Sequence, residues 1–161
     1  MRRVILLVLV LSAVAAAQTA CDTSSIAGTY AVSYIGWMSM AQPGGTVLTL
    51  SGTIVGVISI GFDGKLSGGG TTSAAGMGPP ADWDIFGTAT VNFDCTGTLK
   101  MTPKPRAGGP AGAQTDRFVF NSRDKSLLTT IVDLAQGGQV FYPAISGTWK
   151  QISWLPKMAA W

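Results

Sequence analysis

The stretch Gly87-Thr-Ala-Thr-Val-Asn-Phe-Asp-Cys-Thr-Gly-Thr-Leu-Lys-Met101 predicts two short strands joined by a tight turn. Its flanks are rich in Thr, Val and Leu, which fit the pleated, half-buried surface of a sheet. Between them, Asp94-Cys95-Thr96-Gly97 has the composition of a turn. The stretch also holds Cys95, one of two cysteines in the chain. It therefore indicates an antiparallel β-protein in which this hairpin carries a cysteine that can form a covalent link.

The composition of the whole chain also favours strands. The sequence contains no Glu and no His, has 21 glycines, and uses Thr, Val and Ile throughout. Glu is a good helix former and is common on exposed helix faces. Its absence, with Thr and Ser in its place, indicates an all-β domain.

Turn residues divide the chain into about eight expected strands. Their ranges are 29–38, 46–62, 65–68, 83–93, 96–102, 115–121, 126–134 and 140–152. Asp63-Gly64 predicts a type I′ hairpin, residues 103–114 predict a Pro/Gly-rich loop, and Pro143 predicts a bulge or an edge position. Consecutive hairpins predict an antiparallel up-and-down barrel, because closure removes exposed edges; a β-sandwich is the alternative.

The N-terminus has the three-part layout of a secretory signal. A basic start, Met1-Arg2-Arg3, precedes an apolar run that ends at Ala15-Ala16-Ala17. The run is shorter than the roughly 20 residues of a membrane span. We expect a signal peptide over 1–17, a barrel domain over 18–152, an apolar tail over 153–161, and a secreted or periplasmic protein. An uncleaved anchor and a lipoprotein with lipidated Cys21 are the alternatives.

Removal of this signal changes the charge. Loss of Arg2 and Arg3 lowers the formal net charge from +3 to +1. A charge of +1 offers no electrostatic basis for binding nucleic acid. We expect no stable membrane span after signal removal. An outer-membrane barrel, suggested by the terminal Trp161, is a weaker alternative because Pro156 interrupts the last strand and aromatic girdles are missing.

The two cysteines predict one disulfide, Cys21–Cys95, since an exported chain with two cysteines has one possible pairing. A closed loop of about 75 residues corresponds to about 4 kcal/mol of loop entropy. The absence of His excludes the Ser-His-Asp and Cys-His arrangements of catalysis. Two cysteines without His cannot complete a structural zinc site, so we expect no metal and no cofactor.

Several segments resemble one group of proteins. They are Cys21-Asp-Thr-Ser-Ser-Ile-Ala-Gly-Thr-Tyr30, Gly61-Phe-Asp-Gly64, the cysteine hairpin and Ser146-Gly-Thr-Trp149. This pattern resembles small exported, mostly bacterial proteins that are similar to lipocalin-like and allene oxide cyclase-type barrels. The resemblance implies a calycin-like barrel. It transfers no catalytic residue, because no motif of the cyclases matches a position here.

The carboxylates offer few candidates for catalysis. Asp82 and Asp84 lie two apart on an expected strand and share a face, although the commoner role of such a pair is a solvated strand entrance. Asp116 shares strand parity with Phe118 and Phe120. A carboxylate facing an apolar barrel interior would have a raised pKa, which makes Asp116 the one weak catalytic candidate if it faces inward. The commoner position of such a residue, and the one expected first, is a strand end in solvent.

Five aromatic residues are expected to face inward and to line any ligand site: Tyr30, Tyr34, Phe93, Phe118 and Phe120. An eight-stranded barrel either is filled by its side chains or holds one small ligand. The first hypothesis is therefore a barrel that binds a small hydrophobic molecule. The alternatives are a cyclase- or isomerase-like enzyme, which we favour less, and a structural or interaction protein with a filled core.

Overall fold

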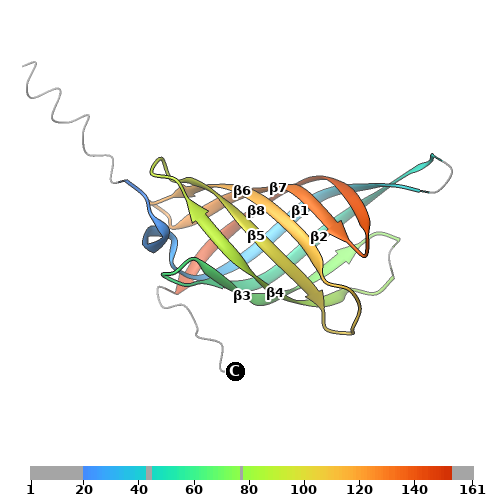
Figure 1. Ribbon diagram of the computed structural model, residues 1–161, viewed down its shortest axis with the longest axis horizontal. Coiled ribbons are helices and arrows are strands. Elements are labelled where there is room, and N and C mark those ends of the chain that lie inside the picture. Colours follow the sequence, from blue (N-terminus) through green and yellow to red (C-terminus); the bar gives the residue numbers. More distant parts are fainter. Residues whose placement is uncertain (1–19, 43–44, 77, 154–161) are drawn as a thin grey trace, which may run out of the picture.

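The structure, a computed structural model, describes residues 20–42, 45–76 and 78–153. The predicted signal peptide and the tail beyond residue 153 lie outside these ranges. Eight strands form one closed barrel in chain order (Figure 1). Each strand is antiparallel to its neighbours, and the last pairs with the first. The predicted up-and-down barrel is confirmed, and the sandwich alternative is excluded.

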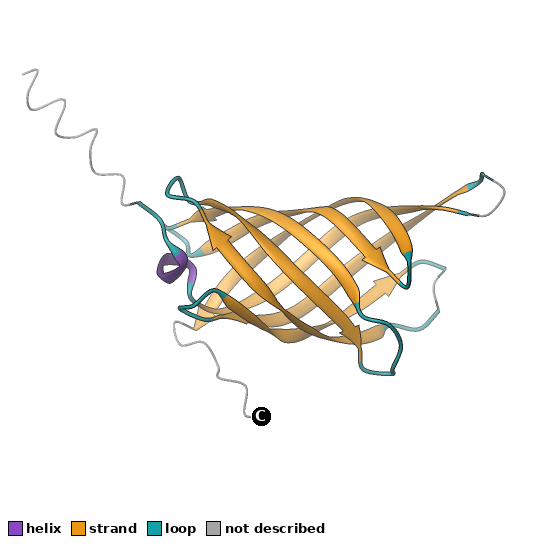
Figure 2. Ribbon diagram, in the orientation of Figure 1, coloured by secondary structure: helices purple, strands orange, loops and turns teal. Residues whose placement is uncertain are grey.

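The strands are long and are joined by short connections, and the one 3₁₀-helix among the described residues lies at one end of the barrel (Figure 2). The elements are η1 (Thr23–Ile26), β1 (Gly28–Ala41), β2 (Val47–Ile60), β3 (Lys65–Ala74), β4 (Ala81–Val91), β5 (Thr96–Pro105), β6 (Gly112–Asn121), β7 (Ser126–Gln136) and β8 (Gln139–Ser153).

The structure corrects several expected strand limits. β3 continues to Ala74, because its small residues pair with β2 and β4 as a ladder that needs no large side chains. The loop expected over 103–114 is shorter, since β5 reaches Pro105 and β6 begins at Gly112. Pro103 is tolerated because the β5–β6 pairing ends at Met101, so its missing N–H removes no bond from that ladder.

The β2–β3 and β4–β5 turns, at the η1 end of the barrel, share one form. Each carries Phe-Asp followed by a residue with positive φ, Gly64 at 78° and Cys95 at 65°. The Asp side chain accepts a hydrogen bond from the backbone N–H two residues later, at 3.1 Å for Asp63 and 3.0 Å for Asp94. The Asp63-Gly64 hairpin is confirmed. The predicted type I′ turn is wrong, because that turn needs positive φ at both central residues and only Gly64 has it.

Two register shifts adjust the barrel near its middle. Val132 is an extra residue of β7 relative to β6, since Thr115 pairs with Asp133 and Asp116 with Ile131. Between Thr130 and Leu134 the β7–β8 register shifts as well, opposite the segment of β8 that contains Pro143. The irregularity predicted from Pro143 is thus confirmed. A β-bulge changes the direction in which nearby side chains point, and the bulge at Val132 lies beside Asp116.

The N-terminal segment closes one end of the barrel. Cys21 and Cys95 form the predicted disulfide, with Cα atoms 5.0 Å apart. The side chain of Ile26 is fully buried, and its carbonyl accepts a hydrogen bond from the Tyr30 hydroxyl at 2.6 Å. Gln151 donates a side-chain hydrogen bond to the Ala27 carbonyl at 2.9 Å. The segment is therefore a cap held by one covalent and several polar contacts.

Candidate functional site

The interior of the barrel contains a charged residue at its centre. Asp116 on β6 has no exposed surface, and Phe118 and Phe120 on the same strand are buried too. Inward and outward positions alternate along a strand, so the shared parity of these residues brings them all into the core. The favoured expectation of a solvent-exposed strand end is wrong, because β6 begins at Gly112 and Asp116 lies within the strand; the inward alternative is confirmed.

A polar network joins four side chains from three strands: Asp116, Tyr34, Gln114 and Trp149. The Asp116 carboxylate accepts a hydrogen bond from the Tyr34 hydroxyl of β1. The other carboxylate oxygen accepts one from the Gln114 side-chain amide at 2.9 Å. The Tyr34 oxygen in turn accepts a hydrogen bond from the Trp149 indole N–H of β8 at 2.7 Å. The network therefore joins β1, β6 and β8 across the interior.

Burial determines the electrostatics of this network. Desolvation raises the pKa of Asp116 to about 6, although hydrogen bonds from Tyr34 and Gln114 act in the opposite direction. The pKa of Tyr34 is raised well above its ordinary value by desolvation and then by the nearby Asp116 carboxylate. At neutral pH the network therefore consists of a neutral phenol that donates to an ionised carboxylate.

A glycine allows Tyr34 to reach its partners. Gly147 is the cross-strand neighbour of Tyr34 on β8. A Cβ atom at Gly147 would lie 2.4 Å from Cδ1 of the Tyr34 ring and 2.7 Å from the Ser33 carbonyl oxygen. The tyrosine ring covers the glycine, as aromatic residues do beside glycines in barrels. The pair Gly97 and Phe118 repeats this arrangement on β5 and β6.

Little space remains beside the network. A cavity of about 20 Å³ lies against Tyr34 and Gln114 and is otherwise lined mostly by apolar side chains, including Ile54, Ile85 and Met101. A water molecule needs roughly 10 to 15 Å³ of such space. The cavity can therefore hold one water molecule, with Tyr34 and Gln114 as polar partners, and it is too small for an organic ligand.

The five aromatic candidates do not share one environment. Tyr30, Tyr34, Phe118 and Phe120 are buried in the barrel, and of these Tyr34 lines the small cavity. The inward position expected for Phe93 is wrong, since this side chain is 79% exposed. β4 ends at Val91, so Phe93 lies in the turn and the alternation of the strand no longer applies to it.

Asp82 and Asp84 lie on the outside of β4. The Thr71 hydroxyl donates to Asp82 at 2.6 Å, and Arg106 forms an ion pair with Asp84 at 2.8 Å. Both acids therefore have surface partners. Within residues 20–42, 45–76 and 78–153, no group of three or more Asp, Glu, Cys or His side chains is placed to hold a metal ion.

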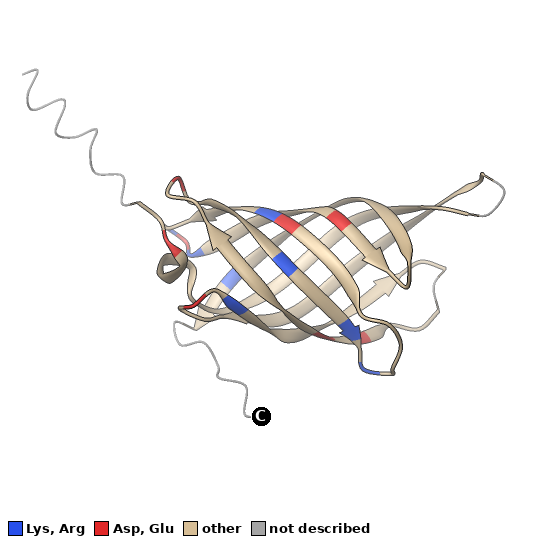
Figure 3. Ribbon diagram, viewed as in Figure 1, with Lys and Arg blue, Asp and Glu red and all other residues tan. Residues whose placement is uncertain are grey.

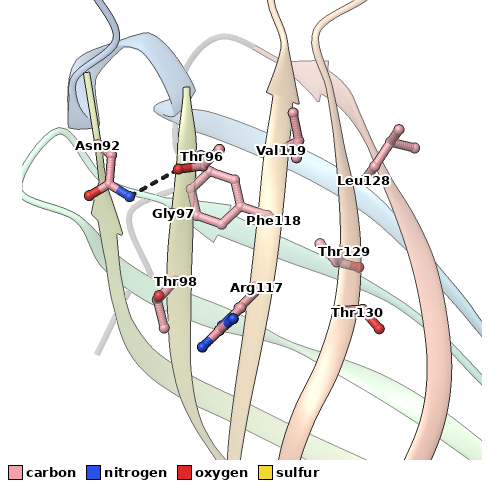
Figure 4. A pocket seen from close by; sticks show the side chains of 10 residues that line it. All are labelled: Asn92, Thr96, Gly97, Thr98, Arg117, Phe118, Val119, Leu128, Thr129 and Thr130. Carbon is pink, nitrogen blue, oxygen red and sulfur yellow. Dashed lines mark hydrogen bonds between the residues drawn. The ribbon is translucent and has the colours of Figure 1, made fainter. Parts of the chain in front are cut away.

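A shallow depression of about 600 Å³ lies over the outer surface of β5, β6 and β7 (Figure 4). Arg117 is its charged residue, and Asn92 donates to the Thr96 hydroxyl at 2.9 Å on its rim. Exposed Val119, Leu128 and Thr130 complete an open surface with mixed chemistry. The arrangement has no paired acid, base or nucleophile, so it offers no site for catalysis.

Three residues of the interior were not expected from the sequence: Gln114, Trp149 and Trp83. Gln114 shares strand parity with Asp116, which is a signal that could have found it. Trp149 belongs to a strand of alternating burial, but its partner Tyr34 is 115 residues away. Trp83 has a buried indole N–H for which the described residues provide no hydrogen-bond partner.

Comparison of the chain with protein-family models and with curated proteins finds no match. Among the described residues, no helix has the length and apolar character needed to cross a membrane. The candidate site is a hydrogen-bonded network that joins β1, β6 and β8 and is enclosed by the barrel.

Proposed function

We propose that this protein is an exported barrel with a filled core that acts through its outer surface, as a structural or interaction protein. The observation that carries the proposal is the size of the cavity at the central network, about 20 Å³. Pockets that bind small organic ligands typically measure about 300 to 1,000 Å³. Side chains of the barrel occupy the corresponding space here.

The disulfide supports export. Cys21–Cys95 joins the N-terminal cap to the β4–β5 turn, and disulfides persist in secreted and periplasmic proteins. The resemblance to small exported lipocalin-like proteins, and the signal sequence expected over residues 1–17, agree with this assignment. A covalent cap and a packed interior are suited to a protein that works outside the cell and keeps its shape there.

The proposal can be tested on protein purified after export. We expect native mass spectrometry to show the polypeptide mass alone, and added benzene to leave the NMR methyl signals of Met101 and Ile54 unchanged. Met101→Ala provides a positive control, because truncation of this cavity-lining side chain creates space that a small apolar molecule can enter. A co-purified organic molecule that is lost on unfolding would overturn the filled-core proposal.

Binding of a small hydrophobic ligand is the second candidate. The buried Trp83 indole N–H is an unused donor among the described residues, and a ligand carbonyl could satisfy it. Met38, Met40 and Leu50 pack the interior toward the end opposite η1. Methionine side chains adapt readily, so this end could open for a ligand. A cyclase- or isomerase-like reaction at Tyr34 and Asp116 would need the same opening.

A further inference from the structure

Charge is distributed unevenly over the outside of the barrel. β1 and β2 contain no charged residue, and β8 contains one, Lys150. The charged residues exposed or partly exposed on the strands otherwise lie on β3 to β7: Lys65, Asp82, Asp84, Lys100, Lys104, Arg117 and Asp133. Figure 3 shows this division, with β1 and β2 free of coloured residues along their length. The outward side chains of β8, β1 and β2 are called the β8–β1–β2 face below.

Large apolar side chains are exposed on this face. Ile35 and Trp37 on β1 are 70% and 58% exposed, and Tyr142 on β8 is 65% exposed. Val55 and Val57 on β2 are exposed as well. Trp and Tyr are the residues that most often anchor protein interfaces. Contiguous apolar surface without charge commonly marks a binding site.

The face combines a ridge with a hollow. Ile35 and Trp37 form the ridge, and both also line one side of a depression of about 460 Å³ that extends over β2 onto β3, at the border of the face. Gly36 and Gly52 contribute no side chain to the depression, and Ser51, Thr53 and Ser73 are small. The ridge therefore lies directly beside a space of uncharged, small residues that can receive an aromatic side chain.

We infer that the β8–β1–β2 face is the interface of a two-fold symmetric dimer of this chain, in which Trp37 of each copy enters the hollow of the other. This inference rests on the proposed function, since it names the partner of the outer surface. In a two-fold interface the same patch meets itself, so ridge and hollow must lie side by side on one copy. That is the arrangement found here.

The lack of charge on this face favours a second copy over a polyanionic partner as the occupant. A face without acidic residues and with one lysine at its end meets its own copy with little like-charge repulsion. A nucleic acid or an acidic membrane would instead be bound through clustered Lys and Arg, which this face lacks. Partner recognition must therefore depend on shape and apolar contact, and a second copy supplies both.

The area of the face fits a stable dimer. Its strands have 14, 14 and 15 residues. With a rise of about 3.3 Å per residue and a strand spacing of about 4.8 Å, the face covers roughly 650 Å². Two copies that bury the whole face would remove about 1,300 Å² in total, and stable interfaces typically bury about 1,200 to 2,000 Å², so the dimer requires nearly all of the face.

Sedimentation velocity of the exported protein, over a concentration range from about 0.1 to 100 μM, tests the inference. We expect a reversible monomer–dimer equilibrium. Trp37→Lys should weaken it by at least about tenfold, because it removes an anchor and places two charges in the interface. Leu128→Lys on β7 is the matched control, since Leu128 is 57% exposed outside the face. Its dimer affinity should equal that of the unmodified protein.

Each outcome supports or overturns the dimer. Retained circular dichroism and melting temperature show that the variants are folded, and Ile35→Ser replaces Trp37→Lys if the latter does not fold. A monomer at every concentration overturns the inference, as does equal weakening by Trp37→Lys and Leu128→Lys. A monomer that binds neutral vesicles or a different protein through Trp37 also overturns it. The filled-core proposal is judged separately, by the ligand content of the same preparation.

Discussion

At the level of single residues, Asp116 combines full burial with two neutral hydrogen-bond donors. Burial of an ionised carboxylate is costly, and the hydrogen bonds from Tyr34 and Gln114 recover part of that cost. The network thus restricts how β1, β6 and β8 can pack, although it does not maximise stability.

The raised pKa of Asp116, about 6 against 3.8, predicts a pH dependence of stability. The folded state binds this proton more tightly than the unfolded state, so its contribution is complete below pH 3.8 and is lost as the pH rises through 6. The loss should approach about 3 kcal/mol. Urea unfolding of the protein and of Asp116→Asn between pH 4 and 7 measures it, since the difference between the two curves isolates Asp116. A constant difference across this range would contradict the prediction.

Tyr34→Phe should lower the free energy of unfolding by about 3 kcal/mol, because it removes the hydroxyl that satisfies both Asp116 and the Trp149 indole. Denaturant titration at pH 7 measures the change. The matched control is Tyr142→Phe, whose side chain is 65% exposed and whose effect should stay within about 0.5 kcal/mol. Equal effects of the two substitutions would show that the buried hydroxyl adds nothing.

At the level of elements, the turns at the η1 end connect local sequence to the cap. Phe-Asp precedes a left-handed residue in both the β2–β3 and the β4–β5 turn. Gly64 adopts this conformation without cost, whereas Cys95 adopts it with a side chain present. A glycine at position 95 could not form the disulfide. Cys95 therefore has a strained backbone conformation, and its side chain links the turn covalently to the cap.

Replacement of both cysteines, Cys21→Ser with Cys95→Ser, should destabilise the protein by about 4 kcal/mol, because the bridge restricts an unfolded loop with a sequence separation of 74 residues. Unfolding in urea measures the effect. Dithiothreitol should reproduce it in the unmodified protein and should change nothing in the double variant. A further loss in the reduced double variant would show that the reductant acts elsewhere.

At the level of the whole molecule, stability depends on closure. β1 pairs with β8 over most of its length, although the two strands are at opposite ends of the described chain. This pairing leaves no sheet edge, and it is also the contact that needs the most distant segments to meet. Closure gives the polar network its geometry, since Tyr34 and Trp149 come from these two strands.

A chain truncated after residue 138 should fail to form a soluble monomer, because loss of β8 exposes the edges of β1 and β7 and removes Trp149 from the core. Size-exclusion chromatography and circular dichroism should show aggregated or unfolded material. A chain truncated after Ser153 keeps all eight strands and should remain folded. A soluble, folded seven-stranded form would refute the requirement for closure.

Local sequence signals were sufficient to predict the class of fold, and the count of two cysteines in a chain with an export signal predicted the disulfide. The parity of Asp116 with Phe118 and Phe120 indicated an inward position as the alternative to a solvent-exposed strand end. Alternation of period two places side chains on one face of a strand, and Gly, Pro and Asp mark turns through their own backbone preferences. These effects act within a few residues. Predictions from local sequence were wrong at the strand boundaries. Phe93 lies in a turn and not in the expected strand. β3 and β5 continue through small residues and prolines, because neighbouring strands pair with them.

The closed tertiary structure determines three further features: the partners of Asp116, the size of the cavity and the uncharged β8–β1–β2 face. Tyr34 lies 82 residues from Asp116 and 115 from Trp149, and no local preference relates positions so far apart. Their contact depends on the register of every intervening strand, including the extra residue Val132. The cavity likewise depends on how side chains from all parts of the chain share one interior, which is a property of the packed molecule and not of any single segment.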